Sequence, residues 1–274
     1  MTNNPITLRR LENFKKSRRG YVSFWIFLVL LALTLPAEFI ANDKPIAVSY
    51  QSDLFFPIFK DYKETEFGGT FETATDFTDP FIIKKIQNEG WIINPLVPFD
   101  HQTVAWDLTM PAPSAPDAIH ILGTDDQARD VLARVIYGFR ISVLFGFTLT
   151  LISAIIGVLA GALQGYFGGW VDLIGQRLIE IWSGMPTLYL LIILASIIEP
   201  NFWWLLGLLL LFSWMGFVGV VRAEFLRARN FDYVRAARAL GLGDFKIMLR
   251  HVLPNALVAT MAFMPFTLAG SVTV

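Results

Sequence analysis

Five long runs without a charged residue constrain the fold of this 274-residue chain more than any other feature. They cover residues 20–37, 141–171, 181–198, 200–221 and 252–274. A helix that crosses the hydrocarbon core of a bilayer needs about 20 apolar residues, within a range of about 17–25, so each run is long enough to span. Barrel strands would instead alternate over about 10 residues. We therefore predict an all-α polytopic membrane protein with five visible membrane-spanning helices.

The composition agrees with this prediction and removes several kinds of site. Hydrophobic residues make up 54% of the chain and charged residues 16%, against about 45–50% and about 25% in soluble domains. Cysteine is absent, which excludes disulfides and cysteine-bound metals. His101 and His120 lie in an acidic region, but neither has the spacing of a metal site. We expect no metal site and interpret these side chains as part of a solvated acidic surface.

The distribution of charge predicts the orientation of the spans. Residues 1–20 carry six basic residues and one acidic residue, residues 41–135 carry seven and fifteen, and residues 222–250 carry seven and three. Short segments rich in Lys and Arg stay in the cytoplasm. We therefore expect the first and third of these segments inside and the second outside, as the alternation of five spans also requires.

The predicted organisation has four parts. They are a cytoplasmic N-terminus (1–20), a first span (21–40), an external insert (41–135) and a core (136–274) with spans at about 141–164, 178–198, 201–221 and 255–274 and a cytoplasmic loop at 222–254. Within the insert, apolar stretches at 81–83 and 91–93 predict small strands or helices, and we favour a compact cap over a loose loop. The last apolar run reaches Val274 without a polar tail, so we expect at least one further span.

The segment before the second run, residues 120–142, predicts a helix on the outer face. Thr124 or Asp125 can cap its N-terminus. Its apolar residues have helical spacing: Val131, Leu132, Val135 and Ile136. Its charged residues interleave: Asp125, Asp126 and Asp130 with Arg129, Arg134 and Arg140. The carboxylates suggest a catalytic cluster, but the neighbouring arginines favour surface ion pairs.

The most strongly patterned polar segment lies between the last two runs. On a helix over 231–240, Tyr233, Ala236, Ala237 and Leu240 fall at i, i+3, i+4 and i+7 and share one face. Gly241 and Gly243 can both adopt positive φ, which predicts a tight turn after this helix.

A second amphipathic helix is predicted after the turn, with Asp244 as its N-cap. Its apolar residues are Phe245, Met248, Leu249 and Val252, and Pro254 closes it or kinks the start of the fifth span. Amphipathic helices can lie on a lipid surface. The small side chains of Ala236 and Ala237 would also let another backbone approach closely, so we favour a protein-docking element.

This segment resembles the EAA loop of bacterial ABC-importer permeases. The matching residues are Arg235-Ala236-Ala237-x-x-x-Gly241 and Leu253-Pro254. Arg235 stands where the family usually has Glu, which leaves the docking geometry intact but not an ion pair assigned to that Glu. The resemblance implies that the loop seats in an ATPase subunit. The implied coupling residues are Tyr233, Arg235, Ala236, Ala237, Leu240, Gly241, Gly243, Leu253 and Pro254.

A second region also resembles the dipeptide and oligopeptide branch of this family. The match runs from His120-x-Leu122-Gly123-Thr124-Asp125-Asp126 through Arg129-Asp130-Val131-Leu132-x-Arg134 to Gly138-x-Arg140-x-Ser142, with Ala128 in place of the usual Gly. The long insert and the stretch 76–81 look most like the branch for microcin C and oligopeptide uptake. The resemblance extends over about residues 8–274.

The resemblance implies a six-helix type I permease fold in the bacterial inner membrane, with a periplasmic insert. It implies peptide import by alternating access, driven by ATP and magnesium bound to a separate ATPase subunit. The implied partners are a second, homologous permease, the ATPase subunits, a periplasmic peptide-binding protein and the lipid bilayer. The chain itself is expected to hold no cofactor and to bind no nucleic acid.

Two other functions are weaker. An ion-coupled secondary transporter usually has ionisable residues within its spans, whereas the runs of this chain contain none. A membrane-embedded enzyme is not favoured, because Ser183-Gly184-Met185-Pro186 lacks the Gly-x-Ser-x-Gly pattern of a catalytic serine. No histidine lies near this serine to activate it. We instead expect Pro186 to kink the helix. Gly157, Gly161 and Gly165 are spaced for close helix packing.

Overall fold

The computed structural model describes residues 5–106, 108, 110–199 and 201–273. The chain divides into two compact units, Met1–Ile141 and Ser142–Val274. The long helix α5 (Val131–Phe167) contributes its first turns to one unit and the remainder to the other. The two units are described separately below.

The first unit begins with three helices, α1 (Pro5–Lys16), α2 (Arg18–Thr34) and α3 (Ala37–Ile40). None of the residues of α2 is buried, and a helix that is apolar all round suits a lipid environment. Its 17 residues lie at the lower limit for a span. The helix stops just before Pro36, which lacks the N–H that a continuing helix requires.

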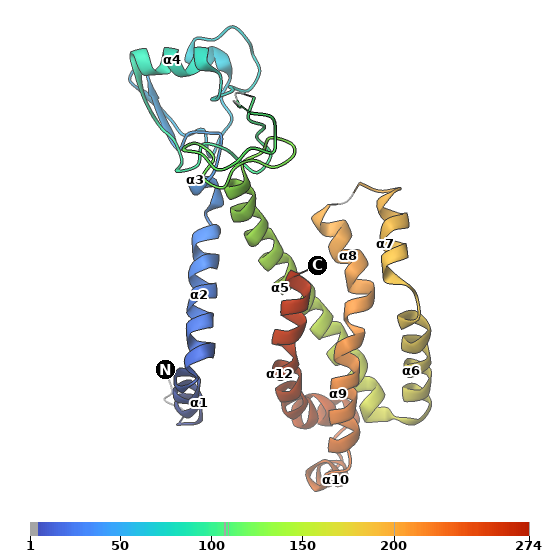
Figure 1. The fold of residues 1–274 in the computed structure, drawn as a ribbon. Coiled ribbons are helices and arrows are strands. Elements are labelled where there is room, and N and C mark those ends of the chain that lie inside the picture. Colours follow the sequence, from blue (N-terminus) through green and yellow to red (C-terminus); the bar gives the residue numbers. More distant parts are fainter. Residues whose placement is uncertain (1–4, 107, 109, 200, 274) are drawn as a thin grey trace. The chain divides into compact units, whose positions relative to one another are not determined.

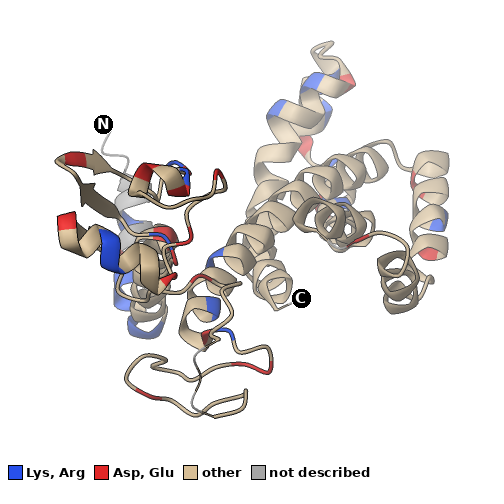
Figure 2. Cartoon of the chain, turned by 90° about the horizontal axis from the view of Figure 1, so that it is seen from above, with Lys and Arg blue, Asp and Glu red and all other residues tan. Residues whose placement is uncertain are grey.

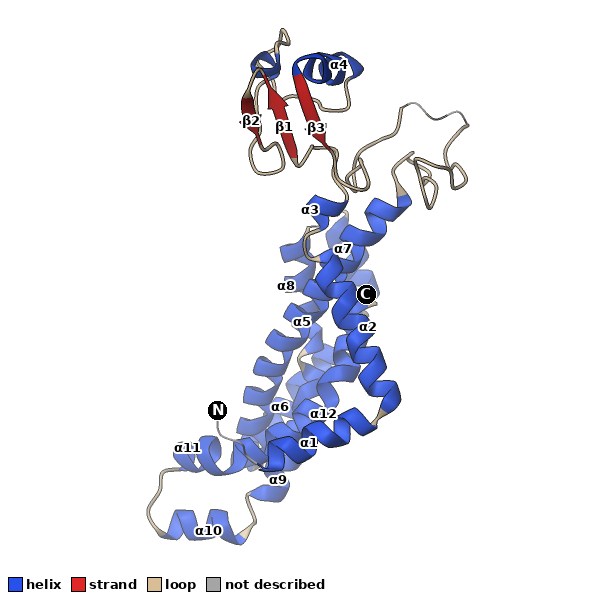
Figure 3. Ribbon diagram, turned by 90° about the vertical axis from the view of Figure 1, so that its left-hand side faces the viewer, coloured by secondary structure: helices blue, strands red, loops and turns tan. Residues whose placement is uncertain are grey.

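A three-stranded antiparallel sheet follows, ordered β2-β1-β3 (Figure 3). Its strands are β1 (Ala47–Tyr50), β2 (Asp53–Phe55) and β3 (Gly90–Ile93). The β1–β2 hairpin has a two-residue turn, and both Gln51 and Ser52 have positive φ, as turns that match the twist of the strands require. The insert thus contains small strands, which the sequence allowed there, and residues 91–93 lie in β3. The chain as a whole is therefore not all-α, because β-branched and aromatic segments in the insert favour strands.

The sheet and helix α4 (Pro80–Glu89) enclose a hydrophobic core. Val48 and Tyr50 of β1 are buried and pack with Phe67, Ile82 and Ile86. Phe67 ends the short 3₁₀ helix η1 (Glu64–Phe67). Asp79 caps α4 by accepting a hydrogen bond of 2.8 Å from the Phe81 backbone N–H. This part of the insert is thus a compact cap with its own core.

The start of α5 differs from the prediction. The helix begins at Val131, and Asp130 rather than Thr124 or Asp125 caps it, accepting from the Ala133 N–H at 2.8 Å. Residues 124–130 form a turn instead of a helix, because Asp125 accepts hydrogen bonds from the Gln127 and Arg129 backbone N–H groups. Residues 131–167 then form one continuous helix, not a separate helix on the outer face.

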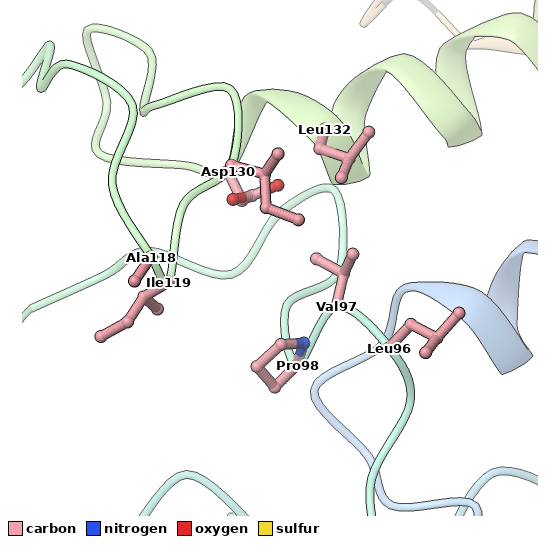
Figure 4. Close-up of a pocket in the computed structure, with 8 residues that line it drawn as sticks. Leu96, Val97, Pro98, Ala118, Ile119, Asp130 and Leu132 are labelled. Carbon is pink, nitrogen blue, oxygen red and sulfur yellow. The ribbon is translucent and has the colours of Figure 1, made fainter.

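His120 and Asp130 are buried, so the expectation of a solvated surface is wrong for them. The His120 Nδ1 lies 2.9 Å from an Asp130 carboxylate oxygen, and the ring stacks on Phe99. Beside them is a cavity of about 270 Å³, in which Asp130 is the one charged residue among apolar side chains (Figure 4). The expected surface pairing holds for Asp125, whose carboxylate bonds to Arg129 and Arg134.

The second unit is helical (Figure 1). After α5 it contains α6 (Gly169–Ser183), α7 (Thr187–Ala195), α8 (Phe202–Ser213), α9 (Met215–Ala228), α10 (Asp232–Ala239), α11 (Asp244–Ile247), the π-helical turn η2 (Met248–Val252) and α12 (Leu253–Val272). These helices lie beside one another and form a bundle.

In the part of the chain that the structure describes, three helical segments are long and apolar enough to cross a membrane: Val131–Phe167, Phe202–Ala228 and Asp244–Val272. The pair α6 and α7 would make a fourth, but it is bent by 60°. The expected straight span at 178–198 is therefore broken after Ser183, and Pro186 stands at the break as the kink that the sequence predicts.

The glycines of α5 contact α9 directly, as their spacing predicts. A Cβ added at Gly157 would lie 2.5 Å from the Trp214 carbonyl oxygen and 2.5 Å from the Phe217 Cβ. At Gly161 and Gly165 it would lie within 3 Å of backbone carbonyls of α9. Small residues at this spacing allow two backbones to approach within a membrane, where packing drives helix association.

Candidate coupling surface

The candidate site is the loop at residues 222–254, of which α10, α11 and η2 form most. Helix α10 ends in a Schellman motif, in which the Leu242 N–H donates to the Ala237 carbonyl and the Gly241 N–H to the Arg238 carbonyl. Gly241 has a φ of +78°, which favours glycine. Gly243 does not use the predicted freedom, because its φ is −66° and it caps α11.

One side of α10 packs inside the chain. Val234 and Ala237 are buried, and they join a core with residues of α5, α9, η2 and α12. The predicted single face is thus divided: Ala237 is inside, whereas Tyr233, Ala236 and Leu240 are exposed. The prediction missed Val234 because a strip at i, i+3, i+4 and i+7 covers only part of the apolar face of a short helix.

The exposed remainder of this face is named here the coupling face: Tyr233, Ala236 and Leu240. The exposed fractions are 39% for Tyr233 and 82% for Leu240. Phe245 follows the turn and is 65% exposed, although the sequence placed it only within the apolar side of the second helix. Arg235 is also exposed, and it forms no ion pair with any residue that the structure describes.

The second helix differs from the prediction. Helix α11 is only four residues long, and its buried residue is Ile247; Met248 and Val252 of the π turn are buried beside it. The helical path then continues through Leu253 and Pro254 into α12. A proline lacks an N–H and its ring presses on the carbonyl four residues earlier. The wider π turn accommodates it there, so Pro254 neither closes the helix nor breaks it.

A polar cluster fastens this loop to the end of α5. The Tyr166 hydroxyl donates to the Asp244 Oδ1 at 2.7 Å, and the Arg238 guanidinium donates to both groups at 3.2 Å. Asp244 therefore bonds to side chains of α5 and α10 and does not act as the predicted N-cap. None of these three contacts was predicted: the two that involve Tyr166 join residues more than seventy positions apart, which leave no local pattern, and the Arg238–Asp244 contact spans the turn between two helices.

The remaining predicted positions support the loop from within. Leu253 packs against the buried core, and Pro254 is exposed at the start of α12. Near it, the Asn255 side chain lies 3.5 Å from the Tyr233 hydroxyl. Among the described residues, no group of three His, Cys, Asp or Glu side chains could hold a metal ion. Figure 1 shows α10 beyond the ends of α9 and α12, so the coupling face lies at one end of the bundle.

Comparison with known proteins agrees with this arrangement. The family model described as "Binding-protein-dependent transport system inner membrane component" matches residues 153–273, which include the whole loop from α10 to α12. The chain is also similar along nearly its full length to two curated proteins. The peptidoglycan transport system permease protein YejE of Agrobacterium fabrum is 56% identical over 294 residues, covering 98% of this chain and 77% of that protein.

The inner membrane ABC transporter permease protein YejE of Escherichia coli is 54% identical over 270 residues, covering 98% of this chain and 79% of that protein. A shorter match, 36% identical over 154 residues, relates 56% of this chain to 52% of the oligopeptide transport system permease protein OppC of Lactococcus lactis. The chain therefore belongs to the family of binding-protein-dependent inner membrane components, and it is a multi-pass membrane permease subunit of an ABC transporter rather than an enzyme.

Proposed function

We propose that this chain is one permease half of an ATP-driven importer that moves peptides across the bacterial inner membrane. Its N-terminus and the loop at 222–254 lie in the cytoplasm, and the insert lies in the periplasm. A second, homologous permease completes the translocation path. A separate ATPase binds ATP and magnesium, and a periplasmic binding protein delivers the peptide. The named relatives, which include peptidoglycan and oligopeptide transport permeases, support the substrate class.

The observation that carries this proposal is the exposure of the coupling face. The Leu240 side chain is 82% exposed at a turn. It therefore contributes little of the stabilising free energy that burial of apolar surface provides. The rest of the loop is packed against the bundle, so the backbone of α10 is held while its outer side remains available. A rigidly held helix with one exposed apolar strip can bind in a groove of a partner protein, as amphipathic helices do in other complexes.

The polar cluster gives a route from the coupling face to the spans. Arg238 lies on α10, Asp244 on α11 and Tyr166 near the end of α5, and all three are bonded to one another. A displacement of α10 by the ATPase would therefore pull on α5 as well as on the adjoining helices α9 and α12. Alternating access follows if the two permease halves tilt together. The runner-up, an ion-coupled secondary transporter, is not favoured by the relatives.

A charged substitution on the coupling face tests the proposal. We expect Leu240→Glu to reduce co-purification of the ATPase with the permease pair at least tenfold, because a carboxylate would have to enter an apolar contact without a partner. Peptide-stimulated ATP hydrolysis and uptake of labelled peptide into vesicles should fall together. The amount of permease in the membrane should stay unchanged, since Leu240 contacts little of its own chain.

Leu54→Glu is the matched control. Leu54 is also an exposed leucine, on β2 of the insert, so the same change of charge falls far along the chain from the loop. We expect this variant to bind the ATPase as the unmodified chain does. Normal ATPase association and normal uptake by the Leu240→Glu variant would overturn the assignment of the coupling face.

A further inference from the structure

The broken span formed by α6 and α7 has no buried core of its own. Both helices are described in full, and none of their residues is buried. The hydrophobic clusters that the described residues of the second unit form belong to α5, α8, α9 and the segments that follow α9. Elements with few buried apolar contacts are the ones that move most easily. The position of the broken span therefore depends on contacts of another kind.

Among the described residues, three side-chain contacts join α6 to other helices. Gln176 donates to the side-chain oxygen of Gln164 on α5 at 2.7 Å, and the Trp182 indole N–H donates to a backbone carbonyl of α8 at 2.9 Å. Each of these is a single hydrogen bond between neutral groups. The third contact is an ion pair between Asp172, in the first turn of α6, and Arg222 of α9.

The Arg222 guanidinium bonds to both oxygens of the Asp172 carboxylate. Its Nε donates to Oδ1, and its Nη2 donates to Oδ2 at 2.7 Å. The side chains of Arg222 and Asp172 are only 29% and 17% exposed, respectively. Two parallel hydrogen bonds fix the orientation of the partners as well as their separation. Of the three contacts, this pair therefore also constrains how α6 is turned against α9.

Charged residues are few on the helices of the second unit outside the coupling loop, as Figure 2 shows. An ionisable residue within a membrane-spanning helix is costly and is usually paired. Helix α6 also carries Arg177 and Glu180, but these pair with each other along the same helix and are more than half exposed. Among the described residues, the Asp172–Arg222 pair is thus the one ion pair that joins α6 to another helix.

Arg222 lies in the part of α9 that is packed against the coupling loop. Phe225, one turn after Arg222, is buried with Val234 and Ala237 of α10 in a single hydrophobic cluster. Close-packed cores have low compressibility and transmit a displacement. A displacement of α10 would therefore shift Arg222, and the bidentate pair would carry that shift to Asp172 and α6.

We propose that Asp172 and Arg222 are positioning residues for transport, which hold α6 to α9 so that the broken span follows the coupling loop when the ATPase acts on it. The attachment rests on the contacts between the two helices, whereas the movement rests on the proposed function. The alternative is a static role, in which Asp172 only complements the partial positive charge at the N-terminus of α6. A static role predicts that Arg222 has no influence on how α6 moves.

Spin labels measure whether α6 follows α9. The chain contains no cysteine, so labels can be placed at Leu178→Cys on α6 and Ala223→Cys on α9, both of which are exposed positions. The complete importer, with cysteine-free partners, is compared without nucleotide and with ATP and vanadate. We expect the same label-to-label distance in both states, and a distance that differs between the states in the Arg222→Gln variant. A distance that changes with the pair intact, or one that stays constant in Arg222→Gln, would overturn the proposal.

Arg177→Gln is the matched control. It makes the same substitution, but the partner of Arg177 lies on the same helix, so the distance should stay constant as in the unsubstituted pair. Arg222→Lys keeps the charge and gives up the planar fork, and it should show a smaller change than Arg222→Gln. If Arg222→Gln does not accumulate in the membrane, Arg222→Lys decides the comparison: a constant distance in that variant would contradict the role of the bidentate geometry.

Transport gives a second measurement that a static role would not change. In liposomes that contain the importer, the ATP hydrolysed per radiolabelled trialanine taken up should rise about two- to thirtyfold in Arg222→Gln, the range for residues that transmit coupling. Co-purification of the ATPase should stay unchanged, since the coupling face is intact. An equal ratio in Arg222→Gln and Arg177→Gln would overturn the proposal. Failure of the unsubstituted importer to take up trialanine, with the distances as expected, would count against peptide import and leave the attachment of α6 to α9 standing.

Discussion

The two ends of α5 are held in place by different interactions. At its N-terminal end, called here the outer end, side chains with polar or charged groups make the contacts: Asp130 bonds to His120, Tyr137 donates to the Ala41 carbonyl at 2.9 Å, and Arg140 pairs with Glu38 at 2.8 Å. Farther along the same helix, Gly157 and its neighbours at four-residue intervals bring the backbone against α9. Polar contacts suit a segment near water, whereas close packing suits one inside lipid, where burial from water adds no driving force.

The largest expected effect is at the outer end. Asp130→Ala removes the hydrogen bond to the Ala133 N–H, a cap contact worth about 1 kcal/mol. It also leaves the buried His120 Nδ1 without its partner, which costs about 1–3 kcal/mol. We expect the free energy of unfolding to fall by about 2–4 kcal/mol, measured by chemical unfolding of the full chain in detergent micelles.

Asp126→Ala is the control for this change. Asp126 lies in the same turn but is exposed, and exposed substitutions usually alter stability by less than about 0.5 kcal/mol. If the two variants unfold at the same denaturant concentration, the buried pair does not hold the outer end of α5, and the contrast between the two ends disappears.

A smaller effect is expected in the C-terminal half of α5, called here the inner end. Gly157→Ala places a methyl group 2.5 Å from a backbone carbonyl and from the Phe217 Cβ, so α9 must move outward. Overpacking of this kind costs about 1–3 kcal/mol. We expect the free energy of unfolding to fall by that amount. Peptide uptake should fall with it, since α5 and α9 would be forced apart.

Gly138→Ala tests whether the effect comes from contact rather than from helix propensity. Gly138 lies on the same helix, but an added Cβ there meets no atom within 4 Å. Alanine favours a helix over glycine by up to about 1 kcal/mol, so this variant should be slightly more stable. Equal behaviour of the two alanine variants would show that the α5–α9 contact does not depend on close backbone approach.

The contrast between the two ends of α5 also explains which features could be predicted from the sequence. Glycines at four-residue spacing and long uncharged runs are local patterns, so the packing of α5 on α9 and the long apolar helices within three of the runs agree with the prediction. The kink at Pro186 was anticipated for the same reason. At the coupling loop, the turn at Gly241 also follows from local chemistry, and the positive φ of this glycine agrees with that expectation.

The features that were missed depend on contacts distant in sequence. Nothing local distinguishes Asp130, which is buried, from Asp126, which is exposed, because the difference lies in the approach of His120 and Phe99. The division of α10 into a buried Val234 side and a free Leu240 side depends on α5 and α12. The β1–β2 hairpin of the insert was missed because its strands have only three or four residues, too few for alternation to outweigh the signal of the long helices.

The smallest effect is expected in the turn that leads into the outer end. Ala128 has a φ of +60°, in the left-handed region that costs a residue with a Cβ about 1–2 kcal/mol. Its backbone is nevertheless fixed there, since its N–H donates to Asp125 and its carbonyl accepts from Ala105. Ala128→Gly removes the strain but gives the unfolded chain more freedom, an opposing term of about 0.5–1 kcal/mol.

The net expectation for Ala128→Gly is a gain of about 0.5–1 kcal/mol in the free energy of unfolding, the difference between these two terms. Ala118→Gly is the matched control, because Ala118 precedes the same turn without a positive φ and should lose stability by the entropy term alone. A gain only at position 128 would show that the turn before α5 holds Ala128 under strain. A loss of stability at both positions would mean that the strain at Ala128 is too small to matter, and that its fixed backbone is set by the hydrogen bonds to Asp125 and Ala105 at no conformational cost.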